Sequence, residues 1–492
     1  MQYRLPSLGM NCSVSPSKFF HSFSIDFADA FRSQTLMILG DKDPIVAVAT
    51  AAGQGGIGIL RLSFPGAMDG EFICALFGDE KTLTPRHAHL MPVRGMDGAV
   101  LDRGIILYFP APHSYTGETV IEIQAHGGPV LMNMLMKAVL ARCEHLGLRL
   151  AEPGEFTKRA FLNGRMDLAQ AEAVADLIDA ASESAVEAAT RSLSGEFSKK
   201  IRSLTDETNE LRAFVEATLD FPEEEIDNLS AGRILERACG VRAALEDVLQ
   251  NACHGSVLRE GVTVAIVGSP NVGKSSLLNA LAQEEIAIVT DIPGTTRDRI
   301  EHWVTIGGVP VRMVDTAGIR KTTDVVESRG IERTLSEIRK ADVVLHLTDA
   351  SGGVPDDDAV LARVLAEVRP GVPLVHVCNK TDLVSGKDDG MTICISAKTG
   401  EGLAVLKKRL LTEVGMAGST DGLFMARERH LHCLRTALHH MDAALLIGTD
   451  ISMIELLAEE LRLAGQALGE ILGETTADDI LGLIFSKFCI GK

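Results

Sequence analysis

The octapeptide GSPNVGKS at residues 268–275 constrains the fold more than any other part of the chain. It fits the pattern GxxxxGK[ST], follows the apolar stretch VTVAIV (262–267) and precedes the amphipathic stretch SLLNAL (276–281). Glycines in such a loop let backbone N–H groups approach phosphates, and the N-terminus of the following helix adds positive potential. The segment therefore predicts a strand, a phosphate-binding loop and a helix, as in a doubly wound α/β domain.

Residues at the end of this loop and in two later segments carry the expected phosphate chemistry. Lys274 can reach the outer phosphates of a nucleotide, and the Ser275 hydroxyl can hold Mg²⁺. The segment GTTRD at 294–298 offers threonine hydroxyls for the metal ion and the outer phosphate. The segment DTAG at 315–318 ends an apolar run with an aspartate for the metal shell and a glycine whose N–H can contact the γ-phosphate. A nucleoside triphosphate with Mg²⁺ is the predicted ligand.

Two further segments specify the base of the nucleotide. In NKTD at 379–382, Asp382 can accept hydrogen bonds from both donors on the edge of guanine, and adenine lacks those donors. Asp382 therefore predicts a preference for GTP over ATP. SAKTG at 396–400 can support the base through backbone groups. The predicted GTP-binding residues are Asn271, Val272, Gly273, Lys274, Ser275, Ser276, Thr290, Asp291, Ile292, Pro293, Gly294, Thr295, Thr296, Asp315, Thr316, Ala317, Gly318, Asn379, Lys380, Asp382, Ser396, Ala397 and Lys398.

The residue after DTAG bears on how GTP would be hydrolysed. Ras-like switches use glutamine at this place to orient the attacking water, and this chain has Ile319. Asn271, next to the glycine–lysine pair, could instead coordinate a monovalent cation beside the phosphates and so neutralise developing charge. The alternative for Asn271 is a side chain that only stabilises the turn.

The chain before the phosphate loop divides into two regions of different composition. Short apolar runs broken by Gly and Pro, followed by a helical stretch at 129–146, predict an α+β domain. From Asp167 to Gln250 the chain is dominated by Ala, Glu, Leu and Arg, and its apolar positions recur at helical spacing, as in 169–193. The predicted strands of the first region lie at 45–50, 56–63, 104–109 and 119–124.

The helical pattern returns after about residue 415, at 428–446 and 451–473. Two helical regions on either side of an α/β module predict one helical domain with a second domain inserted into it. The expected divisions are a tail or upstream start at 1–37, an N-terminal domain at 38–163, a helical domain at 164–260 and 416–492, and an inserted Ras-like G domain at 261–415.

Charge and cysteine content narrow the class of protein. The net charge of −19 argues against a protein that coats nucleic acid without specificity. The nine cysteines are odd in number and form no CxxC pair, so they predict neither a disulfide framework nor a zinc site, and they favour the cytoplasm. Because no run of 18 apolar residues occurs, no membrane-spanning helix is expected. Asp26 and Asp29 weaken a targeting peptide as the explanation of the N-terminal tail.

Over residues 40–492 the chain resembles the MnmE (TrmE) family of tRNA-modification GTPases. The resemblance rests on the GTPase motifs and on five further segments. These are GQGGIGILRLS (53–63), SYTGETVIEIQAHGG (114–128), PGEFTKRAFLNGRMDLAQAEAVADLIDA (153–180), LDFPEEEIDNLS (219–230) and the terminal FCIGK (488–492).

The resemblance implies an activity and its partners. The N-terminal domain would bind a 5-formyl- or 5,10-methylene-tetrahydrofolate and form a homodimer. With the flavoprotein MnmG (GidA), which would carry FAD, the protein would add an aminomethyl or carboxymethylaminomethyl group to C5 of the wobble uridine of certain tRNAs. GTP hydrolysis would depend on K⁺ and on contact between two G domains.

The resemblance also implies roles for single residues. Glu327 matches the family's catalytic glutamate, and Cys489 the cysteine assigned a role in modification. Two positions depart from the family's usual residues. Pro293 stands where members often have a small residue, and Arg165 stands where lysine is common. The matching positions are Asn271, Thr290, Ile292 and Thr295 for K⁺, Ser275 and Thr296 for Mg²⁺, and Arg61, Glu122, Arg165 and Lys492 for folate.

Two alternatives share the GTPase motifs. One is a regulatory GTP-binding switch in ribosome assembly, which would usually carry a basic RNA-binding domain. The other is a folate enzyme whose G domain is only regulatory. The acidic charge and the folate-type N-terminal domain favour a tRNA-modifying GTPase over the ribosome-assembly switch. Only the partner separates a tRNA-modifying GTPase from the folate enzyme.

Overall fold

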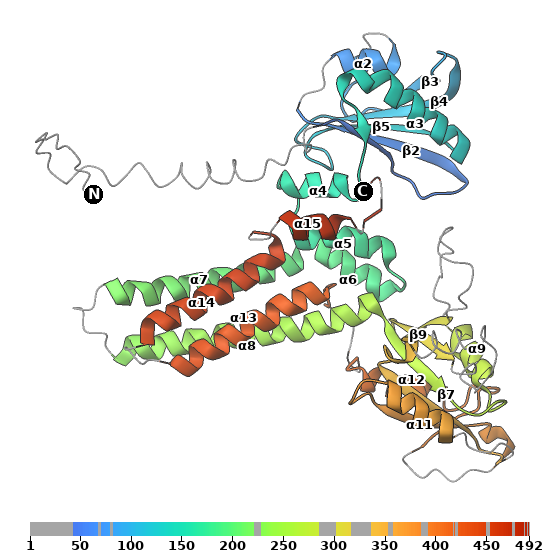
Figure 1. Cartoon of the computed structure of the whole chain (residues 1–492), viewed down its shortest axis with the longest axis vertical. Coiled ribbons are helices and arrows are strands. Elements are labelled where there is room, and N and C mark those ends of the chain that lie inside the picture. The colour runs from blue at the N-terminus through green and yellow to red at the C-terminus, as the bar shows by residue number, and fades with distance from the viewer. Residues whose placement is uncertain are drawn as a thin grey trace, which may run out of the picture.

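The computed structural model shows three bodies along the chain (Figure 1). The N-terminal domain and the G domain both attach near one end of the long helices, and the other end of these helices projects away from them. The structure describes residues 43–66, 70–78, 82–220, 228–284, 302–315, 336–352, 358–384, 392–416, 418, 422–448, 453–474, 478–486, 488–489 and 491. The predicted tail at 1–37 lies outside them.

The N-terminal domain is a six-stranded sheet with helices on both faces. Alternate residues of β2 point to opposite faces: Leu60 and Leu62 are buried against α3, whereas Arg61 lies on the other face, which α4 partly covers. The elements are β1 (Ile45–Val48), β2 (Gly55–Phe64), α2 (Gly70–Phe77), β3 (His89–Arg94), β4 (Val100–Phe109), β5 (Thr119–Gly127), α3 (Pro129–Cys143), β6 (Arg149–Leu150) and α4 (Glu155–Leu162), with strand order β3-β4-β5-β2-β1-β6.

The helical domain is built from both sides of the inserted domain, as predicted. Its long helices α7, α8, α13 and α14 share one apolar core, in which Leu211, Leu245, Leu434 and Leu461 are fully buried. The helices are α5 (Leu168–Asp179), α6 (Glu183–Leu193), α7 (Glu196–Asp220), α8 (Asn228–Glu260), α13 (Glu428–Ile447), α14 (Ile454–Leu472) and α15 (Asp478–Phe485).

The helical stretch expected at 169–193 is two helices in the structure. The first, α5, begins with a capping box in which Asp167 and Gln170 satisfy each other's backbone N–H groups. The second, α6, begins where the Ser182 side chain accepts a hydrogen bond from the backbone N–H of Ala185. A serine cap inside an alanine-rich repeat is therefore the feature that divides the stretch.

The inserted domain is a doubly wound α/β fold, as predicted. All neighbouring strands of its sheet run parallel except β8, which is antiparallel to β9. The elements are β7 (Val262–Val267), α9 (Lys274–Glu284), β8 (His302–Ile306), β9 (Val309–Asp315), β10 (Val343–Asp349), α11 (Asp358–Glu367), β11 (Leu374–Asn379), β12 (Ile393–Cys394) and α12 (Leu403–Glu413), with order β12-β11-β10-β7-β9-β8. Because β7 lies between β10 and β9, the loop after it sits at a topological switch point, where such folds bind ligands.

The G domain packs directly on α6. Ala185, Ala188 and Ala189 of this helix are buried in the apolar core that the G-domain strands form. The Ser182 hydroxyl also donates to the carbonyl of Gly308, in the turn between β8 and β9, over 2.7 Å. Small side chains on α6 therefore allow close contact between the two domains.

A group of charged side chains around two buried carboxylates ties both connections of the G domain to α5. Asp176 of α5 accepts from Arg259, at the end of α8, over 2.9 Å and from Arg427, at the start of α13, over 2.8 Å. Because α8 leads into the G domain and α13 leaves it, one carboxylate holds both connections. The junction cluster comprises Glu172, Asp176, Arg259, Arg427, Arg429 and His430.

Glu172 is the second carboxylate of the junction cluster and is 2% exposed. It accepts from Arg429 over 2.8 Å and from Nε2 of His430 over 2.7 Å. The Nδ1 atom of His430 accepts from the backbone N–H of Arg427, so Nε2 carries the proton. Burial would raise the pKa of Glu172, but the hydrogen bonds from His430 and Arg429 and the charge of Arg429 outweigh burial and hold this pKa well below its usual range.

Glu172→Gln is expected to lower the free energy of unfolding by about 3–5 kcal/mol, because it removes one partner of a buried ion pair. The lowered pKa gives the sign of the pH dependence. The stabilisation is complete above the ordinary glutamate pKa of 4.5 and is lost as the pH falls further. Urea unfolding measures the free energy of unfolding of Glu172→Gln and of the unmodified protein. The difference between the two values should shrink as the pH falls below 4.5. Glu455→Gln, at an exposed position on α14, is the control and should unfold with the free energy of the unmodified protein. A similarly unchanged free energy of unfolding for Glu172→Gln would contradict the prediction.

Within the described part of the chain, no helix combines the length and the apolar character needed to cross a membrane.

Candidate functional site

The phosphate loop connects β7 to α9 and has two residues in the left-handed backbone region. Asn271 has φ 64° and Gly273 has φ 99°. A Cβ atom at Gly273 would collide with the side-chain nitrogen of Asn379, so this position needs glycine for space as well as for conformation. Asparagine tolerates the left-handed region better than most residues, and the Asn271 side chain is exposed beside the loop.

Lys274 is the first residue of α9, and its side chain is buried within the phosphate loop. Its Nζ atom donates to the carbonyls of Gly268 over 2.7 Å and Ser269 over 3.2 Å. These bonds hold the ammonium group across the loop and at the N-terminus of a helix, where a phosphate is favoured. Ser275, next along the helix, is exposed and can offer its hydroxyl to a metal ion.

Asn379, the last residue of β11, joins three loops and is 2% exposed. Its side-chain nitrogen donates to the carbonyl of Val272 over 2.8 Å, and its side-chain oxygen accepts from the backbone N–H of Ala397 over 3.0 Å. The phosphate loop and the two base-specifying segments are thereby held together at one edge of the sheet.

The base-specifying segments are also ordered by their own side chains. Lys380 has φ 67°, and its Nζ atom donates to Asp349 over 2.7 Å. Asp382 lies in the 3₁₀ turn that follows and accepts from the Ser396 hydroxyl over 2.7 Å. The Asp382 carboxylate is otherwise exposed, so it is oriented and also accessible to a base.

The other predicted nucleotide and metal residues divide into two groups. Asp315 is the last residue of β9 and lies opposite Ile266 of β7, close to the phosphate loop, and Lys398 is exposed. The following predicted residues lie outside the described residues: Thr290, Asp291, Ile292, Pro293, Gly294, Thr295, Thr296, Thr316, Ala317, Gly318, Ile319, Glu327 and Lys492.

The N-terminal domain holds the predicted folate residues Arg61 and Glu122 opposite each other on β2 and β5. The Nε atom of Arg61 donates to Glu122 over 2.9 Å. The guanidinium also lies over the ring of Tyr115, 5.5 Å from its centroid. Arg61, Glu122 and Tyr115 therefore form a half-buried group with one cation, one anion and one aromatic face.

A buried polar network underlies this group and fixes loop 114–118. Ser63 donates to Glu118 over 2.6 Å, and Arg159 of α4 donates to the same carboxylate over 3.0 Å. Ser63, Arg159 and Thr116 are each at most 1% exposed. These residues are not among those predicted from the sequence, although each lies within a segment that carries the resemblance.

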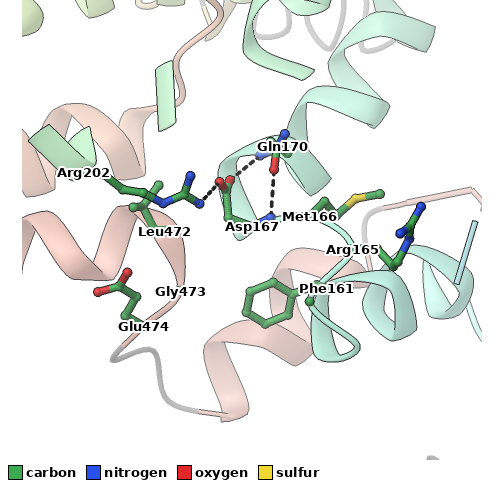
Figure 2. A pocket seen from close by; sticks show the side chains of 10 residues that line it. Phe161, Arg165, Met166, Asp167, Gln170, Arg202, Leu472, Gly473 and Glu474 are labelled. Atoms are coloured by element: carbon green, nitrogen blue, oxygen red, sulfur yellow. Dashed lines mark hydrogen bonds and ion pairs between the residues drawn. The ribbon is translucent and has the colours of Figure 1, made fainter. Parts of the chain in front are cut away.

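Arg165 packs against loop 114–118. Its aliphatic stem packs on Gly117, where an added Cβ would lie 3.1 Å from Cγ of Arg165. It also borders a pocket of about 430 Å³ between the α4–α5 connection and the end of α14. Figure 2 shows Arg165 and Arg202 on opposite sides of Asp167, which accepts from Arg202 over 2.7 Å.

The C-terminal tail returns to the N-terminal domain. The carbonyl of Cys489 accepts from the backbone N–H of Gly154 over 3.3 Å. A Cβ atom at Gly491 would collide with the carbonyl of Val48, so the tail runs directly against the end of β1. Ala47 lies opposite Arg61 in the sheet, and Cys489 is exposed. The tail and the Arg61 group therefore lie in the same part of the N-terminal domain, which is separate from the G domain.

The fold and the site together define a P-loop GTPase whose G domain is inserted into a helical domain. The family described as "GTP-binding protein TrmE N-terminus" matches residues 44–165, and "MnmE helical domain" matches residues 168–489. The chain is 52% identical to a tRNA modification GTPase MnmE of Burkholderia orbicola (strain MC0-3) over 472 residues, 93% of this chain and 100% of that protein. It is equally similar to the protein of the same name from Burkholderia cenocepacia (strain HI2424). The chain belongs to the MnmE (TrmE) family of tRNA modification GTPases.

Among solved structures, the chain is similar to the FeoB G-domain of Methanococcus jannaschii, with 24% identity and a TM-score of 0.24. This similarity covers 31% of this chain and 97% of that one.

Proposed function

We propose that this protein is a K⁺-activated GTP hydrolase that acts in the cytoplasm as a homodimer with the flavoprotein MnmG. Together they would add an aminomethyl or carboxymethylaminomethyl group to C5 of the wobble uridine of certain tRNAs. A tetrahydrofolate would donate the one-carbon unit, and FAD would be carried by MnmG alone. Membership of the family supports the reaction class.

The observation that carries the GTPase half of the proposal is the position of Asn379. Its side chain links the phosphate loop at Val272 to Ala397, while Asp382 is oriented by Ser396. The phosphate loop and the guanine-selecting segments are therefore linked by hydrogen bonds into one site. Mg²⁺ and K⁺ would supply positive charge to the phosphates during hydrolysis.

The described residues of the phosphate loop have the chemistry that these two ions need. Ser275 and Asn271 are both exposed beside the buried ammonium of Lys274, and each offers a neutral oxygen. Such oxygens are the ligands that hard cations prefer. We infer that Ser275 would contribute to the Mg²⁺ site, and Asn271 to the K⁺ site.

The N-terminal site fits a folate in its chemistry. Glu122 can accept hydrogen bonds from the amino and ring N–H groups of a pterin. The Tyr115 ring offers the pterin a flat face. Arg61 holds Glu122 in place, and the exposed Arg165 can pair with the carboxylates of the glutamate tail. The nearby exposed Cys489 is inferred to act in the modification step.

Exposed apolar side chains on the N-terminal domain support the proposed homodimer. Leu90 is 63% exposed on β3 at the edge of the sheet, and Ile105 is 40% exposed directly opposite it on β4. Ile57, at the start of β2, is 64% exposed. Apolar groups of this kind mark surfaces that bind protein or ligand.

The decisive experiment is mass spectrometry of tRNA nucleosides from cells that lack this gene. Loss of the C5 substituent of the wobble uridine, restored by the unmodified gene and not by a GTP-binding variant, supports the proposal. Normal wobble uridine together with an accumulation of immature ribosomal subunits would favour a ribosome-assembly switch. Loss of modification that the GTP-binding variant still restores would favour a folate enzyme with a regulatory G domain.

Arg61→Ala is expected to weaken binding of 5-formyl-tetrahydrofolate by roughly 10- to 100-fold, because it leaves Glu122 without the partner that orients it. Isothermal titration calorimetry measures this, and GTP affinity should not change because the two sites lie on different domains. Arg103→Ala, at an exposed position on β4, is the matched control and should bind folate normally. Equal folate affinity in the two variants would contradict the assignment of Arg61.

A further inference from the structure

Two cysteines lie side by side at the edge of the G-domain sheet. Cys378 of β11 and Cys394 of β12 are register partners in a parallel pair of strands. The backbone N–H of Ile395 donates to the carbonyl of Cys378 over 2.8 Å, so the pairing continues past both residues. Neighbouring strands lie about 4.8 Å apart. This separation falls within the range of Cα distances that a disulfide spans, about 4.4–6.8 Å.

Both side chains point to the same face of the sheet. The preceding residues, Val377 and Ile393, pack into the apolar core on the other face. Because side chains alternate along a strand, Cys378 and Cys394 share the opposite face. Both are half-buried, and β12 is a two-residue strand at the sheet edge. A short edge strand can move by the ångström or so that an S–S bond requires.

The other described cysteines range from buried to exposed, and Cys253 on α8 is half-buried as well. Cys143 and Cys433 are buried, and burial raises the pKa of each thiol to about 11. A thiol with such a pKa is a poor nucleophile at neutral pH because little thiolate is present. Cys74 is exposed on α2 of the N-terminal domain, far from the G domain along the chain and in space.

The cysteine pair is joined directly to the guanine-selecting residues. Cys378 precedes Asn379, and Cys394 lies two residues before Ser396, which donates to Asp382. The backbone N–H of Thr381 also donates to the carbonyl of Ile395 over 3.2 Å. A shift of β12 toward β11 would therefore change the spacing between the two loops that hold the base.

We propose that Cys378 and Cys394 are a modification site for peroxides, and that their oxidation to a disulfide lowers the affinity for guanine nucleotides. One thiolate attacks the O–O bond of the peroxide and becomes a sulfenic acid as the first oxygen leaves as water. The second thiol attacks that sulfur, forms the S–S bond and releases the second oxygen as water. Two thiols and one hydrogen peroxide thus give one disulfide and two waters.

The proposal rests on the GTP binding of the proposed function, and the test separates the two. The full chain is treated with hydrogen peroxide, its remaining thiols are alkylated, and its peptides are mapped by mass spectrometry. We expect a peptide pair joined through Cys378 and Cys394, lighter than the two reduced peptides by two hydrogen atoms. Affinity for a fluorescent GDP analogue should fall about tenfold and return after treatment with a dithiol reductant.

Cys378→Ser and Cys394→Ser should each abolish the cross-link and the fall in affinity, whereas Cys74→Ser should retain both. A sulfinic acid at one position without a cross-link would overturn the proposal. A cross-link that leaves the affinity unchanged would overturn its regulatory part. Failure of the reduced, unmodified protein to bind GDP would instead count against the proposed function.

Discussion

Asn271→Ala is expected to remove the stimulation of GTP hydrolysis by potassium, a loss of about 10³-fold in kcat. Asn271 lies in the phosphate loop with φ 64° and an exposed side chain, so its oxygen is available beside the phosphates. Ile319 stands where Ras-like proteins use glutamine to orient the attacking water, so hydrolysis needs another arrangement. A cation held by Asn271 would neutralise the charge that develops on the phosphates. Nucleotide binding should fall only slightly, because the backbone of the loop and Lys274 remain.

The measurement compares GTP hydrolysis in potassium and sodium chloride at equal ionic strength. Asn279→Ala is the matched control, since Asn279 is an exposed asparagine on α9. Glu327→Ala should keep potassium-stimulated association of G domains and yet hydrolyse GTP slowly. Equal rates in the two salts for the unmodified protein would overturn Asn271 as a potassium ligand.

Asp382→Asn is expected to weaken GTP binding by roughly 10²-fold or more and to shift preference toward xanthine nucleotides. The carboxylate can accept two hydrogen bonds from guanine, and bonds to a charged group contribute about 1.5–3 kcal/mol each. Asparagine would place an N–H donor against a guanine donor, whereas xanthine offers a carbonyl oxygen at that place. The hydrogen bond from Ser396 should persist, because the asparagine oxygen can still accept it.

Competition binding with GTP, XTP and ATP measures this change in specificity. Glu401→Gln alters an exposed carboxylate near the same loops and should leave the specificity unchanged. Full GTP preference in Asp382→Asn would show that Asp382 does not contact the base.

The sequence by itself was sufficient to predict the doubly wound G domain and its insertion into a helical domain. Apolar runs that end in GSPNVGKS, DTAG and NKTD predict parallel strands, and the structure has β7, β9 and β11 at these places. Because the carboxyl ends of parallel strands meet at one edge, the order of the motifs also predicts that their residues lie close together. Local periodicity and steric requirements carry this information, so it can be obtained from the sequence alone.

Tertiary structure decided which polar groups became partners. Arg61 meets Glu122 because β2 and β5 pair in one register, and the two residues are 61 positions apart. Asn379 ties Val272 to Ala397, and Asp176 holds both connections of the G domain. A charged or amide side chain has the same local preferences whether it is solvated or buried, so the sequence pattern does not distinguish the two cases. Only packing excludes water around such a group, and a group deprived of water must find a partner from a distant part of the chain.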